Sequence, residues 1–114
     1  MMNLIEVGRP YWRFAFTMMA KPAQYQQGAG APQSLLAFIR GVRSDDLFAS
    51  AMQQDIAAIV DAADFAALFP ARPVPARYDR LRTVRFSYAV EEWRGSPNDD
   101  EPVLLKLLLR GGQQ

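Results

Sequence analysis

The chain has 114 residues, of which 50% are hydrophobic and 22% are charged, and its formal net charge is +1. A chain of this length buries roughly two-thirds of its unfolded surface, which is enough for one domain with a single core. It contains neither cysteine nor histidine, which excludes disulfide frameworks, the usual zinc sites, cysteine nucleophiles and catalytic triads that depend on histidine.

The basic side chains are almost all arginine, which suits contacts with carboxylates and backbone carbonyls at interfaces, although a GC-rich genome would produce the same bias. The basic excess that is usual in nucleic-acid-binding domains is missing. The first residues lack the features of a signal peptide, and no run reaches the ~20 apolar residues of a membrane span. We therefore expect synthesis in the bacterial cytoplasm and no membrane partner.

In chain order, residues 1–10 are expected to be a flexible lead-in, and the alternating apolar residues of 11–19 predict a strand. The Gly-, Pro- and Gln-rich segment 20–33 predicts a long mobile loop, because connections of that length in compact domains are usually functional or disordered. Residues 35–43 alternate again and predict a second strand. A turn or a short capped helix is expected within residues 44–52.

Residues 53–69 support two predictions. Their alanine content and the helical spacing of their apolar residues favour a helix, so one alternative is an α+β domain with a helix at about 47–68. The same residues also fit a strand over 55–61, after which Asp61 or Asp64 would cap a short helix.

The three prolines within residues 70–75 predict an extended connector. Residues 83–91 and 103–110 alternate clearly and flank a polar, turn-rich segment, which predicts a hairpin with a long loop at 94–102. Residues 111–114 are expected to fray. The result is a single β-dominated domain. Its expected core side chains are Phe38, Phe86, Tyr88, Val90, Leu105 and Leu107.

Acidic side chains cluster at Asp45-Asp46, Glu91-Glu92 and Asp99-Asp100-Glu101. Carboxylates can bind divalent cations, but these spacings do not match a calcium loop, so no metal is expected. Asp61 and Asp64 could serve a carboxylate-only enzyme, which would need a cleft and a raised pKa on one of the two acids. Helix capping explains them better. No glycine-rich phosphate loop is present, and no cofactor is expected.

Basic and aromatic residues alternate in the stretch that contains Arg77, Tyr78, Arg80, Arg82, Arg85, Phe86 and Tyr88. Such mixtures bind single-stranded nucleic acids. In a strand, however, Phe86 and Tyr88 would face away from Arg85, so they fit a core better. Asp79, which lies between Arg77 and Arg80, favours a charge-assisted network that positions the following strand.

The order of these elements resembles a known family. An apolar run ends in DAADF (61–65), a proline-rich stretch with Asp79 follows, and then come a V-x-F-x-Y-x-V strand (84–90), a W-R pair (93–94) and a turn. A last strand ends in R-G (110–111), and R-G-V at 40–42 fits an earlier strand. This layout, over about residues 53–112, resembles the small head–tail joining (neck, stopper or connector) proteins of lambda-like and other siphophages. It departs from them where Arg82-Thr83 replaces a turn glycine.

The resemblance implies a small β-barrel or sandwich with one or two short helices, and a strand over residues 55–61. It implies a structural protein without catalysis, cofactor or metal, whose copies form a ring, expected to be six-fold, in the virion neck of a phage or prophage. The implied partners are neighbouring copies, the portal-side adaptor and the tail proteins, with packaged DNA nearby. Candidate assembly-interface residues are Tyr25, Gln26, Arg77, Arg80, Arg94, Asp99 and Asp100. A small nucleic-acid-binding barrel and a carboxylate-only enzyme remain the alternatives.

Overall fold

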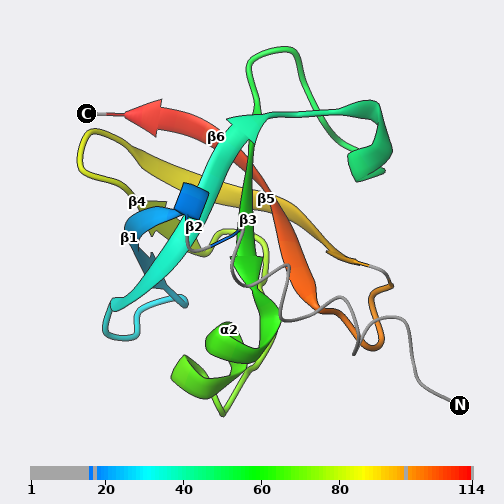
Figure 1. Cartoon of the computed structure of the whole chain (residues 1–114). Helices are drawn as coiled ribbons and strands as arrows, with labels where there is room; N and C mark the ends of the chain where they lie inside the picture. The colour runs from blue at the N-terminus through cyan, green and yellow to red at the C-terminus, as the bar shows by residue number, and fades with distance from the viewer. Residues whose placement is uncertain (1–15, 17, 97, 114) are drawn as a thin grey trace, which may run out of the picture.

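The computed structural model of the chain describes residues 16, 18–96 and 98–113. Six antiparallel strands close into a barrel with the neighbour order β1-β2-β3-β6-β5-β4, and pairing of β1 with β4 completes the barrel (Figure 1). The strands are β1 (Lys21–Gln26), β2 (Gln33–Gly41), β3 (Ile56–Asp61), β4 (Arg80–Arg82), β5 (Ser87–Ser96) and β6 (Leu104–Gln113). The predicted mainly-β fold, a small barrel with a short helix, is confirmed.

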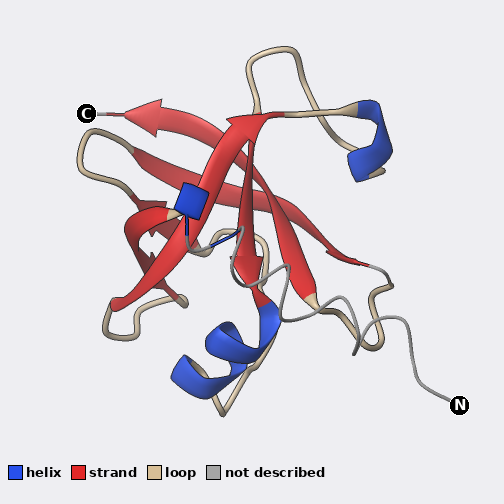
Figure 2. Ribbon diagram, viewed as in Figure 1, coloured by secondary structure: helices blue, strands red, loops and turns tan. Residues whose placement is uncertain are grey.

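Two three-stranded meanders, β1-β2-β3 and β4-β5-β6, make up the barrel. The connection between them contains the helix α2 (Ala62–Leu68), which lies at one end of the barrel (Figure 2). A 3-10 turn, η1 (Ser44–Asp46), lies on the long β2–β3 connection, away from α2 (Figure 2). Of the two alternatives expected for residues 44–52, the turn is found at Ser44–Asp46. The short helix over residues 47–52 does not form, since Leu47 ends η1 with a left-handed φ of 63°.

The core fills the barrel and continues under α2. Inward-facing strand residues in the core are Ala23, Tyr25, Leu35, Ala37, Ala58, Val60, Leu81, Val90, Leu105, Leu107 and Leu109. From the helical end, Phe65 and Phe69 contact Tyr25 edge-on, with ring centroids 4.9 and 5.6 Å away. Edge-to-face contacts of this kind are favourable beyond the area they bury. The three rings therefore fasten α2 and the residue after it to the barrel.

The alanine-rich segment is a strand where the barrel needs one. The strand predicted over residues 55–61 is confirmed as β3, and the alternative helix across 47–68 is wrong. Ala58 pairs with Ile39 of β2 on one side and with Leu107 of β6 on the other. Pairing on both sides and burial inside the barrel override the intrinsic preference of alanine for helix.

Asp61 marks the change from strand to helix. Its Oδ1 accepts the N–H of Asp64 at 3.0 Å, which is the predicted N-cap of α2. Residues 69–79, which contain the three prolines, form neither helix nor strand, as expected.

The segment predicted as a long loop at 20–33 is mostly sheet. It contains all of β1 and the first residue of β2, so that the connection is reduced to residues 27–32. Only Ala23 and Tyr25 of β1 are buried, on alternate positions, and the strand was missed because two inward residues give too short an alternation to outweigh the surrounding Gly, Pro and Gln.

The strand predicted over residues 83–91 begins late, at Ser87. Residues 83–86 form a turn, in which the Thr83 hydroxyl accepts the N–H of Phe86 at 3.1 Å and the Thr83 N–H donates to the Phe86 carbonyl at 2.8 Å. The hydroxyl and the amide of Thr83 thus close a turn that contains no glycine. Val84, expected within the strand, lies at the tip and is 99% exposed.

The predicted core is correct for Val90, Leu105 and Leu107, whereas Phe38 and the aromatic pair Phe86 and Tyr88 are only half-buried. Phe38 faces outward because it lies one position from the inward residues of β2, and the aromatic pair lies at the rim of the barrel. The alternation of residues 35–43 therefore marked a strand correctly but assigned Phe38 to the wrong face of it.

Both ends of the final hairpin are more regular than expected. β5 reaches Ser96 and β6 begins at Leu104, so strand replaces the first part of the loop predicted at 94–102. The tail predicted to fray, residues 111–114, continues β6 as far as Gln113. The flexible lead 1–10 and most of the strand predicted at 11–19 lie outside the described residues; in the latter, Phe16, Met18 and Met19 have helical backbone.

Candidate functional site

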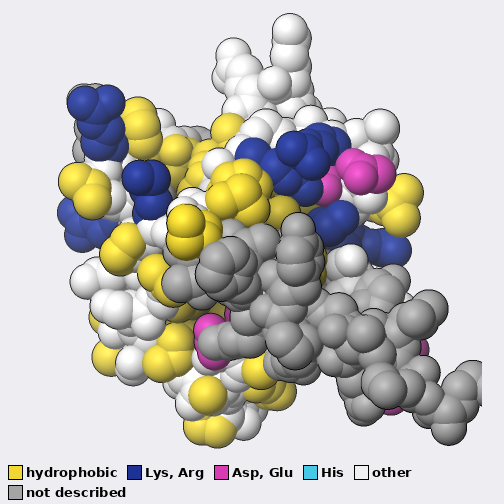
Figure 3. Space-filling model, in the orientation of Figure 1, with side chains coloured by type: hydrophobic (Ala, Val, Ile, Leu, Met, Phe, Trp, Pro, Cys, Tyr) yellow, Lys and Arg dark blue, Asp and Glu magenta, His cyan; other side chains and the backbone are white. Residues whose placement is uncertain are grey.

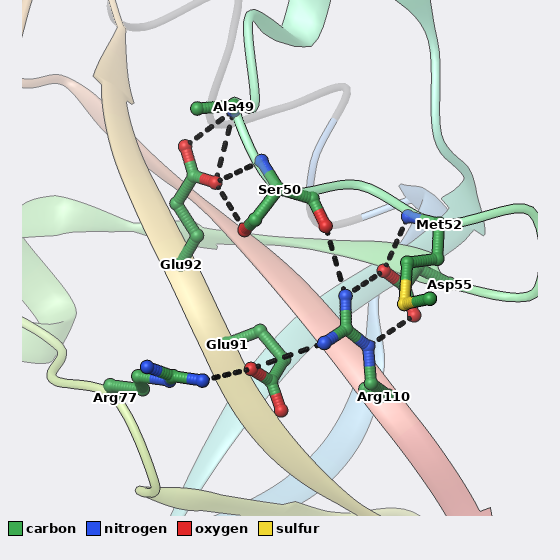
Figure 4. Close-up of polar contacts among 8 residues, drawn as sticks. All are labelled: Ala49, Ser50, Met52, Asp55, Arg77, Glu91, Glu92 and Arg110. Carbon is green, nitrogen blue, oxygen red and sulfur yellow. Dashed lines mark hydrogen bonds and ion pairs between the residues drawn. The ribbon is translucent and has the colours of Figure 1, made fainter.

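A β-bulge in β5 places two consecutive glutamates on the outer face of the barrel. The register pairs Val90 with Leu109 and Glu92 with Leu108, so Glu91 is the extra residue. Val90 is buried inside, whereas Glu91 and Glu92 both reach polar partners outside the barrel (Figure 4). The bulge therefore presents two carboxylates on the same side of one strand.

Arg110 of β6 is the centre of the polar contacts on this face (Figure 4). Its Nε and Nη2 donate to the two carboxylate oxygens of Asp55 at 2.9 and 2.7 Å, and Nη2 also donates to the Ser50 carbonyl at 2.9 Å. Its Nη1 lies 3.3 Å from Oε2 of Glu91, which is also 3.3 Å from Nη2 of Arg77. One guanidinium thus joins β6, β5 and the β2–β3 connection.

Glu92 holds the β2–β3 connection against the same face. Its carboxylate accepts the N–H groups of Ala49 and Ser50, each at 2.9 Å, and the Ser50 hydroxyl at 2.7 Å. Asp55 in turn accepts the N–H of Met52 at 2.8 Å. Side chains of the sheet and of the connection itself therefore fix a segment that is not part of any strand.

Asp46, at the end of η1, anchors the earlier part of this connection. Its buried carboxylate accepts two hydrogen bonds from the Arg40 guanidinium, at 2.6 and 2.8 Å, and one from the N–H of Arg43 at 2.8 Å. Nζ of Lys106 lies 3.4 Å away. Because Arg40 belongs to β2 and Lys106 to β6, the aspartate links the strands on either side of β3.

The anchoring carboxyls are held in their ionised form. The hydrogen bond from Arg40 lowers the pKa of Asp46 to about 2, and the hydrogen bond from Arg110 lowers that of Asp55. Burial alone would raise the pKa of Glu92, but the N–H of Ala49 and the groups of Ser50 outweigh burial and lower it. A general acid at neutral pH needs a pKa shifted upward, so these three carboxyls are suited to structure rather than to proton donation.

A cleft of about 720 Å³ opens beside Arg110, at the end of the barrel opposite α2. It lies between residues 52–56, the aromatic pair Phe86 and Tyr88, and the end of β6 at residues 110–112. The Tyr88 ring packs on Gly112, where an added Cβ would lie 2.5 Å from Cε1. With Arg110 already paired to acids, the cleft offers aromatic and amide surface rather than free positive charge.

A buried network of hydrogen bonds around Asp79 joins β1 to the proline-rich connection. The carboxylate of Asp79 accepts the Tyr25 hydroxyl at 2.7 Å, the Arg72 guanidinium at 2.8 and 2.9 Å and the N–H of Ala76 at 2.9 Å. Burial, and after it the hydrogen bond to Asp79, raises the pKa of Tyr25. The predicted charge-assisted network around Asp79 exists, but its arginine is Arg72 rather than Arg77 or Arg80.

The candidate interface residues do not form one surface. Tyr25 is fully buried in the core, so it is not available to a partner of this fold. Gln26 donates to the Gly30 carbonyl at 2.9 Å and supports its own turn. Arg77 pairs with Glu91 and lies 4.8 Å from the centre of the Tyr78 ring.

The remaining candidates lie at opposite ends of β5. Arg80 is exposed on β4 and donates to the Ser87 hydroxyl at 2.9 Å. At the other end, Asp99 accepts the N–H of Gly95 at 2.7 Å and lies 3.8 Å from Nε of Arg94, while Asp100 is exposed in the same turn. Arg80 therefore lies about the length of a strand away from Arg94, Asp99 and Asp100.

Sequence reasoning missed the anchors at Arg40, Asp55 and Arg110 altogether. Arg110 and Asp55 are 55 residues apart, and no local pattern connects them. One indication of this polar face was present in the sequence. The consecutive glutamates Glu91 and Glu92 interrupt the alternation of apolar and polar residues in the strand, as a β-bulge does.

Among the described residues, no three or more acidic side chains gather into a group that could hold a metal ion. In the same part of the chain, no helix has the length and apolar character needed to cross a membrane. A scan against models of known protein families finds no match, and a search of characterised proteins finds no similar sequence.

Proposed function

We propose that this chain is a structural protein of the neck of a tailed phage or prophage, where copies of it form a ring at the head–tail junction. The observation that carries the proposal is β3, an alanine-rich strand that runs directly into α2 through the cap at Asp61. The resemblance to head–tail joining proteins implied a strand over residues 55–61, whereas the alanine content of the same residues favours a helix. This strand was the most specific structural expectation that the resemblance gave.

The use of the polar side chains also favours an assembly role. Asp46, Asp55, Asp79 and Glu92 are each committed to several hydrogen bonds within the fold. Asp61, one of the candidate acid pair, caps α2 by accepting the backbone N–H of Asp64. These structural uses of the carboxylates favour an assembly role over the carboxylate-only enzyme.

The closed barrel favours contacts between copies through turns and outward side chains. Within the described residues every strand of the barrel has a neighbouring strand on both sides, so little strand edge is left to which another copy could add a strand, although β4 covers only Ser87–Ala89 of β5. Exposed apolar residues suitable for such contacts include Leu47, Met52, Tyr78 and Val84.

The proposal is tested by deleting the gene from the bacterium that carries it and inducing phage production. We expect DNA-filled heads and complete tails that remain separate in electron micrographs, and joined virions when a plasmid copy is supplied. A plasmid copy with the exposed Asp45→Asn change is the control and should join them as well as the unchanged gene does. Normal virions from the deleted strain, with heads joined to tails, would show the proposal to be wrong.

A further inference from the structure

Three arginines lie around the β4–β5 turn without an acidic partner. Arg80 and Arg82 are exposed on β4, and Arg85 is exposed in the turn. In the described part of the chain, none of the three has an ion-pair partner, in contrast to Arg40, Arg72 and Arg110. Figure 3 shows basic side chains on the side where Figure 1 places β4 and this turn, with no acidic side chain among them. We call Arg80, Arg82 and Arg85 the basic end.

An acidic turn lies at the opposite end of β5, and two of its carboxylates, those of Asp100 and Glu101, have no ion-pair partner in the described part of the chain. Asn98 accepts the N–H groups of Asp100 and Glu101 at 3.1 and 2.7 Å, which holds the turn in shape and leaves both carboxylates exposed. Gly95 is required here, because an added Cβ would collide with the backbone oxygen of Asn98. We call residues 98–101 the acidic turn.

β5 separates these two surfaces. It has ten residues, and at about 3.3 Å per residue it places them roughly 30 Å apart, at opposite ends of the barrel. They are therefore too far apart to neutralise each other within one molecule. Each is complementary in charge to the other on a second copy.

We propose that copies of this chain associate head to tail, with the basic end of one copy against the acidic turn of the next. Val84, 99% exposed between Arg82 and Arg85, supplies the apolar centre of the contact. An interface between two different surfaces of the same chain is heterologous, and a heterologous contact closes into a ring when its rotation permits. This inference rests on the proposed function and specifies which surfaces make the ring.

The occupant is a second copy rather than a nucleic acid for two reasons. Phosphate contacts would use the arginines but leave the acidic turn unexplained, whereas self-association uses both. The half-buried rings of Phe86 and Tyr88, which could stack on bases, line the cleft beside Arg110 instead of lying with Arg80 and Arg82 on the outer face.

Charge reversal at each end gives a direct test. Arg82→Glu with Arg85→Glu makes both ends acidic, and Asp100→Lys with Glu101→Lys makes both ends basic. None of these side chains has a hydrogen bond or ion pair within the described chain, so the fold should survive. Asp45→Lys is the control for Glu101→Lys, because it makes the same charge change at an exposed position in η1.

Self-association is measured by sedimentation velocity, at protein concentrations up to about millimolar, in low salt and in physiological salt. The wild-type chain should associate, more weakly as salt rises. Each reversed variant alone should associate about tenfold or more weakly, because attraction at the interface becomes repulsion. Asp45→Lys should behave as the wild type does.

An equimolar mixture of the two charge-reversed variants is the most direct test of the proposed head-to-tail contact. Each contact between unlike variants is again between opposite charges, so association should return, and an alternating ring closes if the number of copies is even. Damage to the fold cannot produce this restoration. A wild-type chain that stays monomeric, variants that associate as well as wild type, or a mixture that does not recover would each overturn the inference.

The experiments distinguish a failure of the proposed neck function from a failure of the proposed head-to-tail contact. If the deletion strain yields unjoined heads and tails while the charge variants associate normally, the neck function stands and the head-to-tail surfaces are wrong. If a DNA duplex binds the wild-type chain, fails to bind the Arg82→Glu, Arg85→Glu variant, and no self-association occurs, the arginines serve phosphate contacts and the inference is overturned.

Discussion

Buried aspartates set the polar architecture at the scale of single residues. Asp46, Asp55 and Asp79 are all buried, and each lies within 3 Å of an arginine guanidinium. Removing one partner of such a pair leaves a buried charge uncompensated, which costs more than the pair itself contributes. Each aspartate also accepts at least one backbone N–H, so it fixes both a strand and a connection.

The pKa of Asp46 predicts an acid-dependent loss of stability. Its pKa falls from 3.8 in the unfolded chain to about 2 in the fold, so the unfolded state binds more protons between these values. The stabilisation is complete above about pH 5 and is lost as the pH falls through 4 towards 2. It should amount to roughly 2 kcal/mol.

This is checked by measuring the free energy of unfolding of wild type and Asp46→Asn from pH 7 to pH 2. The gap between the two should narrow as the pH falls, whereas the exposed Asp45→Asn control should follow wild type. Parallel curves for wild type and Asp46→Asn would contradict the assignment.

At the scale of elements, the bulge in β5 and the β2–β3 connection depend on each other. The bulge brings Glu91 and Glu92 to one face, and Glu92 binds two consecutive N–H groups of the connection. The connection lacks strand pairing of its own between η1 and β3. Its order therefore depends on a few polar anchors rather than on a continuous ladder.

Replacing Glu92 by Gln should loosen this connection locally. Gln keeps the size of the side chain but loses the charge that strengthens its three hydrogen bonds. We expect amide hydrogen exchange at Ala49 and Ser50 to become about tenfold or more faster. Exchange along β6 should stay unchanged, as should exchange at Ala49 in a Glu101→Gln control. Faster exchange throughout the barrel would instead indicate that Glu92 supports the whole fold.

For the whole molecule, a closed barrel with an interior of alternating large and small side chains explains the single core. Ala58 lies opposite Leu107 in the β3–β6 register, so a small residue makes room for a large one. Tyr25, Phe65 and Phe69 fill the end under α2. The three-residue strand β4 closes the described sheet by pairing with β1 on one side and with Ser87–Ala89 of β5 on the other.

Truncation of the core should destabilise the whole barrel. Leu107 is fully buried in the core, so Leu107→Ala should lower the free energy of unfolding by about 2–5 kcal/mol. Val84→Ala removes apolar atoms from a fully exposed side chain and should change it by less than about 0.5 kcal/mol. Urea denaturation of both variants measures the difference, and equal costs would mean that the inward face of β6 is misassigned.

The sequence alone predicted those features that depend on neighbouring residues. The alternation of residues 103–110 predicted the inward leucines of β6, and the proline-rich stretch predicted an irregular connector. The cap of α2 was narrowed to Asp61 or Asp64, and it is Asp61. Each follows from the backbone preferences and side-chain period of a few consecutive residues.

The tertiary structure decided what depends on register and closure. The alanine-rich segment is a strand rather than a helix because it pairs with β2 and β6. In the same way, β1 is a strand because it pairs with β2 and β4. The pairs Tyr25–Asp79 and Asp55–Arg110 join residues more than fifty positions apart. The bulge that aligns Glu91 with Glu92 exists only against a partner strand. Such contacts stabilise the fold only once the chain has closed into the barrel, so no local pattern in the sequence predicts them.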